Sequence, residues 1–414
     1  MKHDVLMKEG RPAGDSSGHK RLGLDGLIWL AVIAVTPIQQ LLYVEVSPAV
    51  RFLPLAASLV SLVTMRIVRV RHSTALLLSA LFVVAAGFVS GANSSRQDSL
   101  AVAVLFALLI AIAPCALAFQ IRTVRRYASL MVQVFISVQT LSAIVGVLQS
   151  FGLTPFGFRA RGGRINGLAE HPNVLGLMAG LSILVLLSLL WKRIGSRAGV
   201  GLLLLLQIYV LVLSGSLSSI IALAVGLIVY IFALPKNYRV LVLVYTIFAS
   251  LLIVVVGPVR LIGLLPGYTE DRLADVLGQS GSGVASAQIR LQTYEFALNY
   301  LERDPFVGVG MDSMNQSTVV QDLVVHNYVL RAWFQGGVLL LVAMLLLTAV
   351  LVAAAFVGLR TRDLAPSATI FAMFGFALTS AFYTQSLYWL PLFVSLAFIS
   401  ERERANGQLE QVVD

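Results

Sequence analysis

Long apolar runs separated by short polar segments make up most of this chain. A membrane-spanning helix needs about 20 mainly apolar residues, and runs of this kind predict about twelve spanning helices. The expected ranges are 25–44, 47–65, 74–91, 98–119, 128–150, 172–190, 199–213, 216–234, 240–259, 327–357, 366–384 and 387–400. The pair 199–213 and 216–234 is short, so we expect Ser214-Gly215-Ser216 to form a tight turn at the surface. The pattern predicts an all-α integral membrane protein.

The composition agrees with a membrane location. Of the 414 residues, 58% are hydrophobic and 12% are charged, whereas a soluble domain has about 45–50% apolar and about 25% charged residues. In a soluble protein the net charge of +10 would suggest a nucleic-acid partner. Here the basic residues sit in short loops between apolar runs, which makes them a topology signal instead.

The distribution of lysine and arginine predicts the orientation, because these residues accumulate in cytoplasmic loops. With the N-terminus inside, 20 of the 30 basic residues, including all five lysines, fall on the inner side. Both termini are then cytoplasmic. The expected organisation is a tail 1–24, a nine-helix membrane region 25–260, a long extracytoplasmic loop 261–325, a three-helix membrane region 326–400 and a tail 401–414.

The long loop contains an expected amphipathic helix at 285–303, because its apolar residues recur near a 3.6-residue period. Gly281-Ser282-Gly283 predicts a flexible segment before this helix. Asp304-Pro305 is expected to end it, since proline disfavours the helical state in the residue before it. Gly308-Val309-Gly310 predicts a turn. It is no nucleotide-binding fingerprint, because no strand–turn–helix unit surrounds it.

Several kinds of chemistry are disfavoured by what the sequence lacks. Cys115 is the single cysteine, which excludes an internal disulfide and a cysteine metal cluster. The five histidines show no H-E-x-x-H spacing, so we expect neither a metal nor a cofactor. Ion-driven carriers usually hold ionisable groups near the bilayer midplane, and the centres of the predicted spans hold none. The first 24 residues are polar and show no cleavable signal pattern.

Three polar sites fall on the outer side of the predicted topology. Arg164 lies just before the sixth span, Arg290 lies in the amphipathic loop helix, and His326 lies at the outer start of the tenth span. The alternatives are lipid-headgroup anchors or ion pairs for the arginines, for instance with Glu170 or Glu295, and a helix-capping role for His326. The convergence of these three residues favours a reaction at the outer interface over a path through the bilayer.

The motifs around these residues resemble a known family. R-x-x-G-x-x-x-H-P-N at 164–173, R-x-x-x-Y-x-x-A-L at 290–298, D-P-F-x-G-x-G at 304–310 and H-N-Y-x-L at 326–330 occur in the order found in the O-antigen ligase and polymerase superfamily. The resemblance covers roughly residues 130–350. In one departure, many relatives have a Ser-Arg pair where this chain has Ser216-Leu217. The role of that arginine is therefore absent here or supplied elsewhere.

The resemblance implies a GT-C-like helical membrane fold in the bacterial cytoplasmic membrane, with the active site on the extracytoplasmic face. It also implies a glycosyltransferase that moves a glycan from an undecaprenyl-diphosphate carrier to an acceptor hydroxyl, without a nucleotide sugar or a metal. The acceptor is a glycan, a lipid or a protein. The sequence leaves open whether the enzyme is a ligase or a polymerase.

The residue types suit this chemistry. Arginine binds phosphate through a planar, two-pronged set of donors, which suits Arg164 and Arg290 to a lipid diphosphate. Neutral imidazole accepts a proton near pH 7, which suits His326 to the role of general base. Weaker substrate-binding candidates are Arg159, Arg161, Arg303, Asp312, Asp322, Asn327 and Tyr294, the last by stacking on sugars. His171 and Asn173 are expected to be mainly structural, at the start of the sixth span.

Two other classes of function compete with this interpretation. A polysaccharide or lipid transporter or flippase would also have about twelve spans, but it should show paired halves and intramembrane ionisable groups. A membrane scaffold would not need a histidine and arginines on one face. A glycosyltransferase joins the glycan to a new acceptor, whereas a transporter or flippase only moves it across the bilayer. An assay for a new glycosidic bond therefore separates these two classes.

Overall fold

The computed structural model describes residues 22–39, 41–42, 46–94, 98–158, 164–234, 282–311, 325–380 and 386–413. The predicted ninth span at 240–259 and the candidates Arg159, Arg161, Asp312 and Asp322 lie outside these residues. The described residues are helical and contain no β-strand. This confirms the all-α prediction.

A helix overlaps each of the other eleven predicted spans, and one more overlaps the predicted loop helix. The helices are α1 (Leu24–Val35), α3 (Leu53–Val63), α4 (Ser73–Ser94), α5 (Asp98–Thr123), α6 (Tyr127–Ser150), α7 (Pro172–Trp191), α8 (Arg197–Leu213), α9 (Leu217–Ala233), α13 (Ser282–Arg303), α14 (Tyr328–Arg360), α15 (Leu364–Ala377) and α16 (Ser386–Val413). Short 3-10 segments extend α1 at Thr36–Ile38, precede α3 at Pro48–Phe52 and lie at Pro155–Gly157. By length and apolar composition, α4, α5, α6, α7 and α14 can each cross a membrane.

Close packing of small residues fixes the direction of two helices at the centre of the bundle. A Cβ added to Gly226 of α9 would lie 3.1 Å from Cβ of Ala372 in α15, and one added to Gly375 would lie 3.4 Å from Cα of Ala222. The residue number rises along one helix as it falls along the other, so α9 and α15 are antiparallel. Small residues let such helices approach closely in a membrane. The start of α9 therefore lies beside the end of α15.

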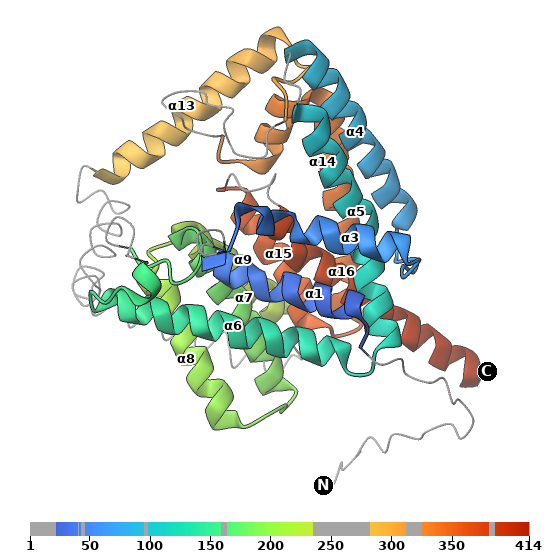
Figure 1. The fold of residues 1–414 in the computed structure, drawn as a ribbon, viewed down its shortest axis with the longest axis vertical. Helices are drawn as coiled ribbons and strands as arrows, with labels where there is room; N and C mark the ends of the chain where they lie inside the picture. The colour runs from blue at the N-terminus through green and yellow to red at the C-terminus, as the bar shows by residue number, and fades with distance from the viewer. Residues whose placement is uncertain are drawn as a thin grey trace.

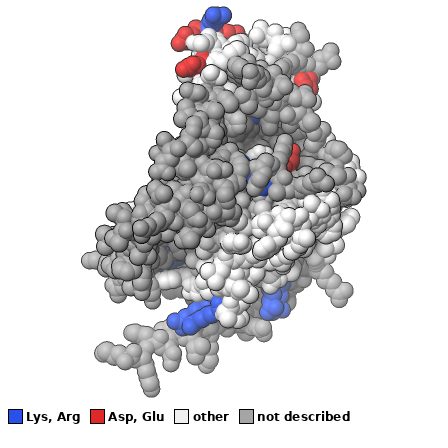
Figure 2. Space-filling view, turned by 90° about the vertical axis from the view of Figure 1, so that its left-hand side faces the viewer, with Lys and Arg blue, Asp and Glu red and all other residues white. Residues whose placement is uncertain are grey.

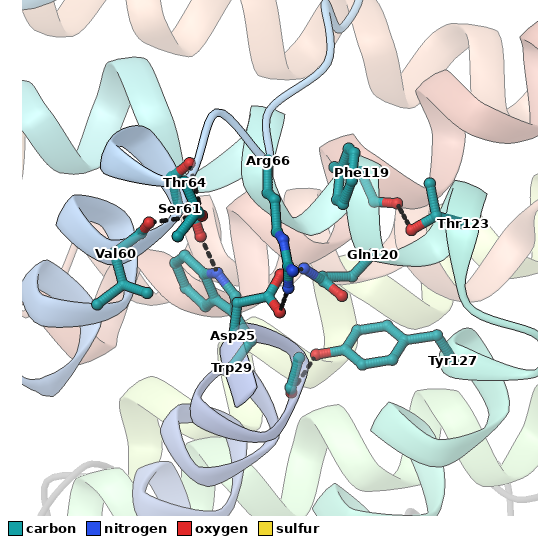
Figure 3. A network of polar contacts seen from close by, with 11 residues as sticks. Asp25, Trp29, Val60, Ser61, Thr64, Arg66, Phe119, Gln120, Thr123 and Tyr127 are labelled. Carbon is teal, nitrogen blue, oxygen red and sulfur yellow. Dashed lines mark hydrogen bonds and ion pairs between the residues drawn. The ribbon is translucent and has the colours of Figure 1, made fainter. Parts of the chain in front are cut away.

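Ion pairs and buried hydrogen bonds join the helices at one end of the bundle (Figure 3). The Asp25 carboxylate is buried and accepts hydrogen bonds from Arg66 and from Gln120. Trp29 Nε1 donates to Ser61 Oγ at 3.0 Å. Arg122 and Glu401 form two hydrogen bonds of 2.9 and 2.6 Å, and Arg71 pairs with Glu403. We call this part of the molecule, where Asp25, Arg66, Arg71, Arg122, Glu401 and Glu403 meet, the basic end.

α14 folds back on itself at Gly337. The hydroxyl of Tyr328 lies 2.9 Å from Oγ1 of Thr348, although a straight helix would place residues 20 positions apart about 30 Å apart. Gly337 has φ +63° and ψ −161°, a backbone conformation that is essentially restricted to glycine. Residues 328–336 therefore form a short arm that packs alongside the longer part, 338–360, which ends at the basic end.

This fold-back corrects the predicted tenth span. The run 327–357 is not one continuous span, because the spanning part of α14 begins only after Gly337. His326 consequently does not lie at the outer start of a span. It precedes the arm, whose first residue lies beside Thr348, so it sits roughly 15 Å from the turn at Gly337 along the helix axis. Periodicity could not separate the two parts, since both are mainly apolar and helical.

The segment after α13 wraps the Gly337 turn. Val309 N donates to Phe334 O at 3.0 Å, Gly310 N donates to Gln335 O at 2.9 Å and Val338 N donates to Phe306 O at 3.3 Å. A Cβ on Gly308 would collide with the backbone of Gln335. The D-P-F-x-G-x-G motif is therefore a backbone clamp around the turn, and its glycines are needed for the close approach.

α13 crosses the end of the bundle opposite the basic end. Figure 1 shows it far from both termini, with its C-terminal end near α4. The segment that follows is tied to this end, because Met311 N donates to Ser99 Oγ at the start of α5 at 2.9 Å. α13 stops at Arg303 as Asp304-Pro305 predicts, but it begins at Ser282. Ser282 and Gly283 thus belong to the helix, and the flexible segment predicted there is wrong.

The described charged side chains lie mostly at the two ends of the molecule. Figure 2 looks onto the left-hand side of Figure 1 and shows described charged side chains at its top and near its bottom, with a few others between them. Glu302 and Arg303 are exposed at the end of α13, and Lys192 and Arg193 are exposed just after α7.

Gly337→Ala is expected to destabilise the protein. This glycine-restricted backbone conformation costs an L-residue about 1–3 kcal/mol, and the added Cβ would also collide with the carbonyl of Phe306. We expect a lower thermal unfolding temperature in detergent. The matched control is Gly201→Ala in α8, where a Cβ would meet no atom within 4 Å. Equal unfolding temperatures for both variants would contradict the fold-back.

Candidate functional site

Arg164 is buried and held by two fixed oxygen atoms. The residue as a whole is only 6% exposed. Nε donates to the carbonyl of Ser214 at 2.8 Å, and Nη2 donates to Oδ1 of Asn173 at 2.7 Å. Ser214 ends α8 and Asn173 lies in the first turn of α7. The guanidinium therefore joins the α8–α9 turn to the start of α7, with a fixed orientation.

The first turn of α7 is built to present Asn173. His171 is the N-cap of α7, and its Nδ1 accepts from Asn173 N at 3.1 Å, while Pro172 occupies the first helical position. Ser219 Oγ donates to the carbonyl of Asn173 at 3.0 Å. The predicted structural role of His171 is confirmed. Asn173 is structural as well, and it also positions Arg164.

The α8–α9 turn is buried, whereas we expected it at the surface. Gly215 has φ +55°, as a tight turn requires, but Ser214 is 0% exposed and Ser216 is 1% exposed. A Cβ on Gly176 of α7 would lie 2.7 Å from Ser214 Oγ. The serines are buried because their hydroxyls bond within the turn, as in the 2.7 Å contact of Ser216 Oγ with Ser219 Oγ. The shortness of the two flanking spans suggested a turn at the surface, so this part of the prediction is wrong.

The residues after Arg164 are fixed against α6. Gln149 Oε1 accepts from Asn166 N at 3.1 Å and from Gly167 N at 2.8 Å, and Gln149 Nε2 donates to the carbonyl of Gly167 at 3.0 Å. Gly167 has φ +57°, and its Cβ would collide with the carbonyl of Ser142. The spacing of Arg164 and Gly167 within the motif thus reflects a loop that only glycine can close.

His326 lies between α13 and α15. Its carbonyl accepts from the hydroxyl of Tyr294 in α13 at 3.1 Å. The next residue, Asn327, is the N-cap of α14 and accepts from Val329 N and Leu330 N at 3.1 and 3.0 Å, and its Nδ2 donates to the carbonyl of Leu378 at 3.5 Å. Leu378 is the C-cap of α15. Asn327 therefore attaches the start of the arm to the end of α15.

Arg164 and His326 meet the same pair of helices at the same end. Arg164 bonds to the turn that leads into α9, and the residue after His326 bonds to the C-cap of α15. Because α9 and α15 are antiparallel and packed together, the start of α9 lies beside the end of α15. Two residues that are 162 positions apart in sequence are thereby brought to neighbouring helix ends, opposite the basic end.

The α13 candidates fall into two groups. Arg290 lies one turn before Tyr294 in α13, about 6 Å away along the helix axis. Arg303 is exposed at the far end of α13, nine residues and about 14 Å from Tyr294 along the helix. The structure therefore separates Arg303 from His326.

Arg331 is a residue that we did not single out from the sequence. It lies on the arm of α14, its residue is 1% exposed, and its backbone N–H donates to the carbonyl of Asn327 at 2.8 Å. A signal was present, because an arginine four residues after Asn327 shares its helix face. The hydrophobic pattern, however, predicts an ordinary span over this stretch. No group of three or more His, Cys, Asp or Glu side chains in the described residues is placed to hold a metal ion.

Comparison with known proteins agrees with this arrangement. A family model described as O-antigen ligase matches residues 201–345, a range that contains α9, α13, the clamp at 304–310 and His326. No curated protein matches the chain. The match confirms the resemblance to the O-antigen ligase superfamily over this segment. Together with the apolar helices, the match indicates a multi-pass membrane protein that is similar to O-antigen ligases over residues 201–345.

Arg164→Lys is expected to destabilise the loop between α6 and α7. A lysine ammonium cannot occupy both the Nε and the Nη2 positions, and a hydrogen bond to a charged group contributes about 1.5–3 kcal/mol. The thermal unfolding temperature in detergent should therefore fall. Arg197→Lys, at the exposed start of α8, is the matched control and should unfold like the wild type. An unchanged unfolding temperature for Arg164→Lys would show that the two bonds do not stabilise the fold.

Proposed function

We propose that this protein transfers a glycan from an undecaprenyl-diphosphate carrier to an acceptor hydroxyl, on the face of the membrane opposite the basic end. The observation that carries the proposal is the placement of Arg164 and His326 at neighbouring ends of α9 and α15. The family match supports the class of reaction. The positive-charge distribution supports a cytoplasmic basic end, with both termini inside a bacterial cytoplasmic membrane.

Arg164 is proposed to bind the diphosphate. An arginine has five N–H donors in one plane, and the bonds to Ser214 and Asn173 fix that plane. Both of these partners are neutral oxygen atoms that orient the guanidinium. A preoriented cation stabilises charge that develops in a transition state, here the charge on the departing diphosphate. Arg290 is proposed as the second such group.

His326 is proposed as the general base. In a single displacement, its neutral imidazole takes the proton of the acceptor hydroxyl while that oxygen bonds to the anomeric carbon. The bond between this carbon and the phosphate oxygen breaks, and its electron pair leaves with the lipid diphosphate. This hypothesis predicts inversion at the anomeric carbon. No step needs a metal, so a chelator should leave the rate unchanged.

The fold-back of α14 sets how far His326 lies from the outer end of the bundle. His326 lies roughly 15 Å from the Gly337 turn along the arm, so an acceptor must enter the bundle from the outer end to reach it. Burial removes competing water from the site and strengthens the attraction between arginine and phosphate. This placement, with a helical scaffold of the GT-C-like kind, suits a lipid-linked donor whose diphosphate lies near the membrane surface. Asp312, Asp322, Arg159 and Arg161 remain proposed contributors from segments outside the described residues.

His326→Ala is expected to lower the rate of glycan transfer by about 10²–10⁴-fold, the usual contribution of a general base. The assay uses the purified protein in liposomes with lipid-linked oligosaccharide and an acceptor. His72→Asn, at an exposed position of the basic end, should transfer at the normal rate. A wild-type rate of glycan transfer by His326→Ala would contradict the general-base role of His326. Movement of the donor across the bilayer without a new glycosidic bond would instead favour a flippase.

The surface glycans of a deletion strain separate a ligase from a polymerase. A polymerase joins repeat units, so its loss should leave single repeats on the final acceptor and no long chains. A ligase moves finished chains, so its loss should leave long chains on the carrier lipid. Glycans identical to those of the parent strain would contradict both forms of the proposal.

A further inference from the structure

The loop that carries His326 is attached to α13 by one side chain hydroxyl. Tyr294 Oη donates to the carbonyl of His326 at 3.1 Å. Tyr294 is half-buried, and it lies four residues after Arg290 on the same helix. The bond therefore links the helix that holds a proposed diphosphate ligand to the peptide that holds the proposed base.

The rest of α13 packs on the arm of α14 through apolar contacts. Ala297 is 0% exposed and belongs to one cluster with Val325 and Phe334, and the rings of Tyr300 and Phe334 pack edge to face with their centroids 5.4 Å apart. Residues 294, 297 and 301 follow a helical stripe, so Tyr294 lies at the end of this stripe. Apolar packing fixes the height of α13 over the arm. The Tyr294 hydroxyl then sets its register against the His326 peptide.

The His326 peptide is held from two sides. Tyr294 binds its carbonyl from α13, and the neighbouring Asn327 side chain binds the end of α15. A backbone held in this way leaves the imidazole few positions to sample. Small displacements of a catalytic group are costly, because a shift of about 1 Å can lower a rate by roughly 10²-fold.

We propose that Tyr294 is a positioning residue, whose hydroxyl locks the His326 peptide to α13 so that Arg290 and the base keep a fixed relation. This inference rests on the proposed function. It differs from the role expected from the sequence, in which the Tyr294 ring stacks on a sugar. A phenylalanine stacks as well as a tyrosine but cannot donate the hydrogen bond, so the two roles give opposite results for one substitution.

Tyr294→Phe is therefore the decisive variant. We expect kcat for glycan transfer to fall about tenfold, the rate equivalent of one hydrogen bond, with a KM for the lipid-linked donor close to that of the wild type. The matched control is Tyr300→Phe, on the same helix, whose ring packs on Phe334. It should keep a normal kcat. A normal kcat for Tyr294→Phe, equal losses in both variants, or a loss confined to KM would each overturn the positioning role.

A double-mutant cycle tests whether Tyr294 acts through His326. Single-turnover assays with excess enzyme measure the slow rates of His326→Ala and of the double variant. If Tyr294 only positions His326, its loss should not slow the His326→Ala protein further. If the fold-losses of the two single variants multiply in the double variant, Tyr294 acts independently of His326 and the inference is refuted. A normal rate for His326→Ala alone would refute the general base instead, so the two failures remain distinguishable.

Discussion

The reversal of α14 at Gly337 is the constraint on which the rest of the candidate site depends. It replaces a single long helix by a spanning helix and an arm, and so it places His326 beside the end of α15 instead of at the end of a span. The reversal requires a glycine conformation at Gly337 and a partner for the backbone groups that the turn exposes. The clamp at 304–310 supplies that partner. Buried backbone groups without partners are very costly in a bilayer.

The need to pair buried backbone groups also explains the part of the site around Arg164. The α8–α9 turn is buried, and its Ser214 carbonyl would lack a partner without Arg164 Nε. Serine hydroxyls and the close approach at Gly176 complete the turn. Arg164 thus stabilises the fold with the same atoms that orient it for an anion. Structural and chemical roles coincide, and a lysine at this position would lose both.

Hydrophobic pattern and turn chemistry predicted much of this architecture. Pro172 and Asp304-Pro305 mark where α7 begins and α13 ends, because proline acts locally. The reversal at Gly337 was missed, since the sequence is mainly apolar on both sides of it and the clamp comes from a separate motif at 304–310. The partners of Arg164 could not be predicted either. Ser214 is 50 positions away, and only the packing of α7 against α9 brings it within reach. Local patterns fix the elements, whereas these long-range contacts fix the site.

The fold-back is tested most directly by a cross-link within α14. In a chain with Cys115 replaced by serine, cysteines at Tyr328 and Thr348 are treated with a bis-maleimide about 10 Å long, and the linked peptides are identified by mass spectrometry. Because the two side chains touch in the folded-back helix, an efficient intramolecular link is predicted. In one straight helix the positions would be about 30 Å apart, so the absence of a link, with both cysteines labelled singly, would contradict the arrangement from which the placement of His326 follows.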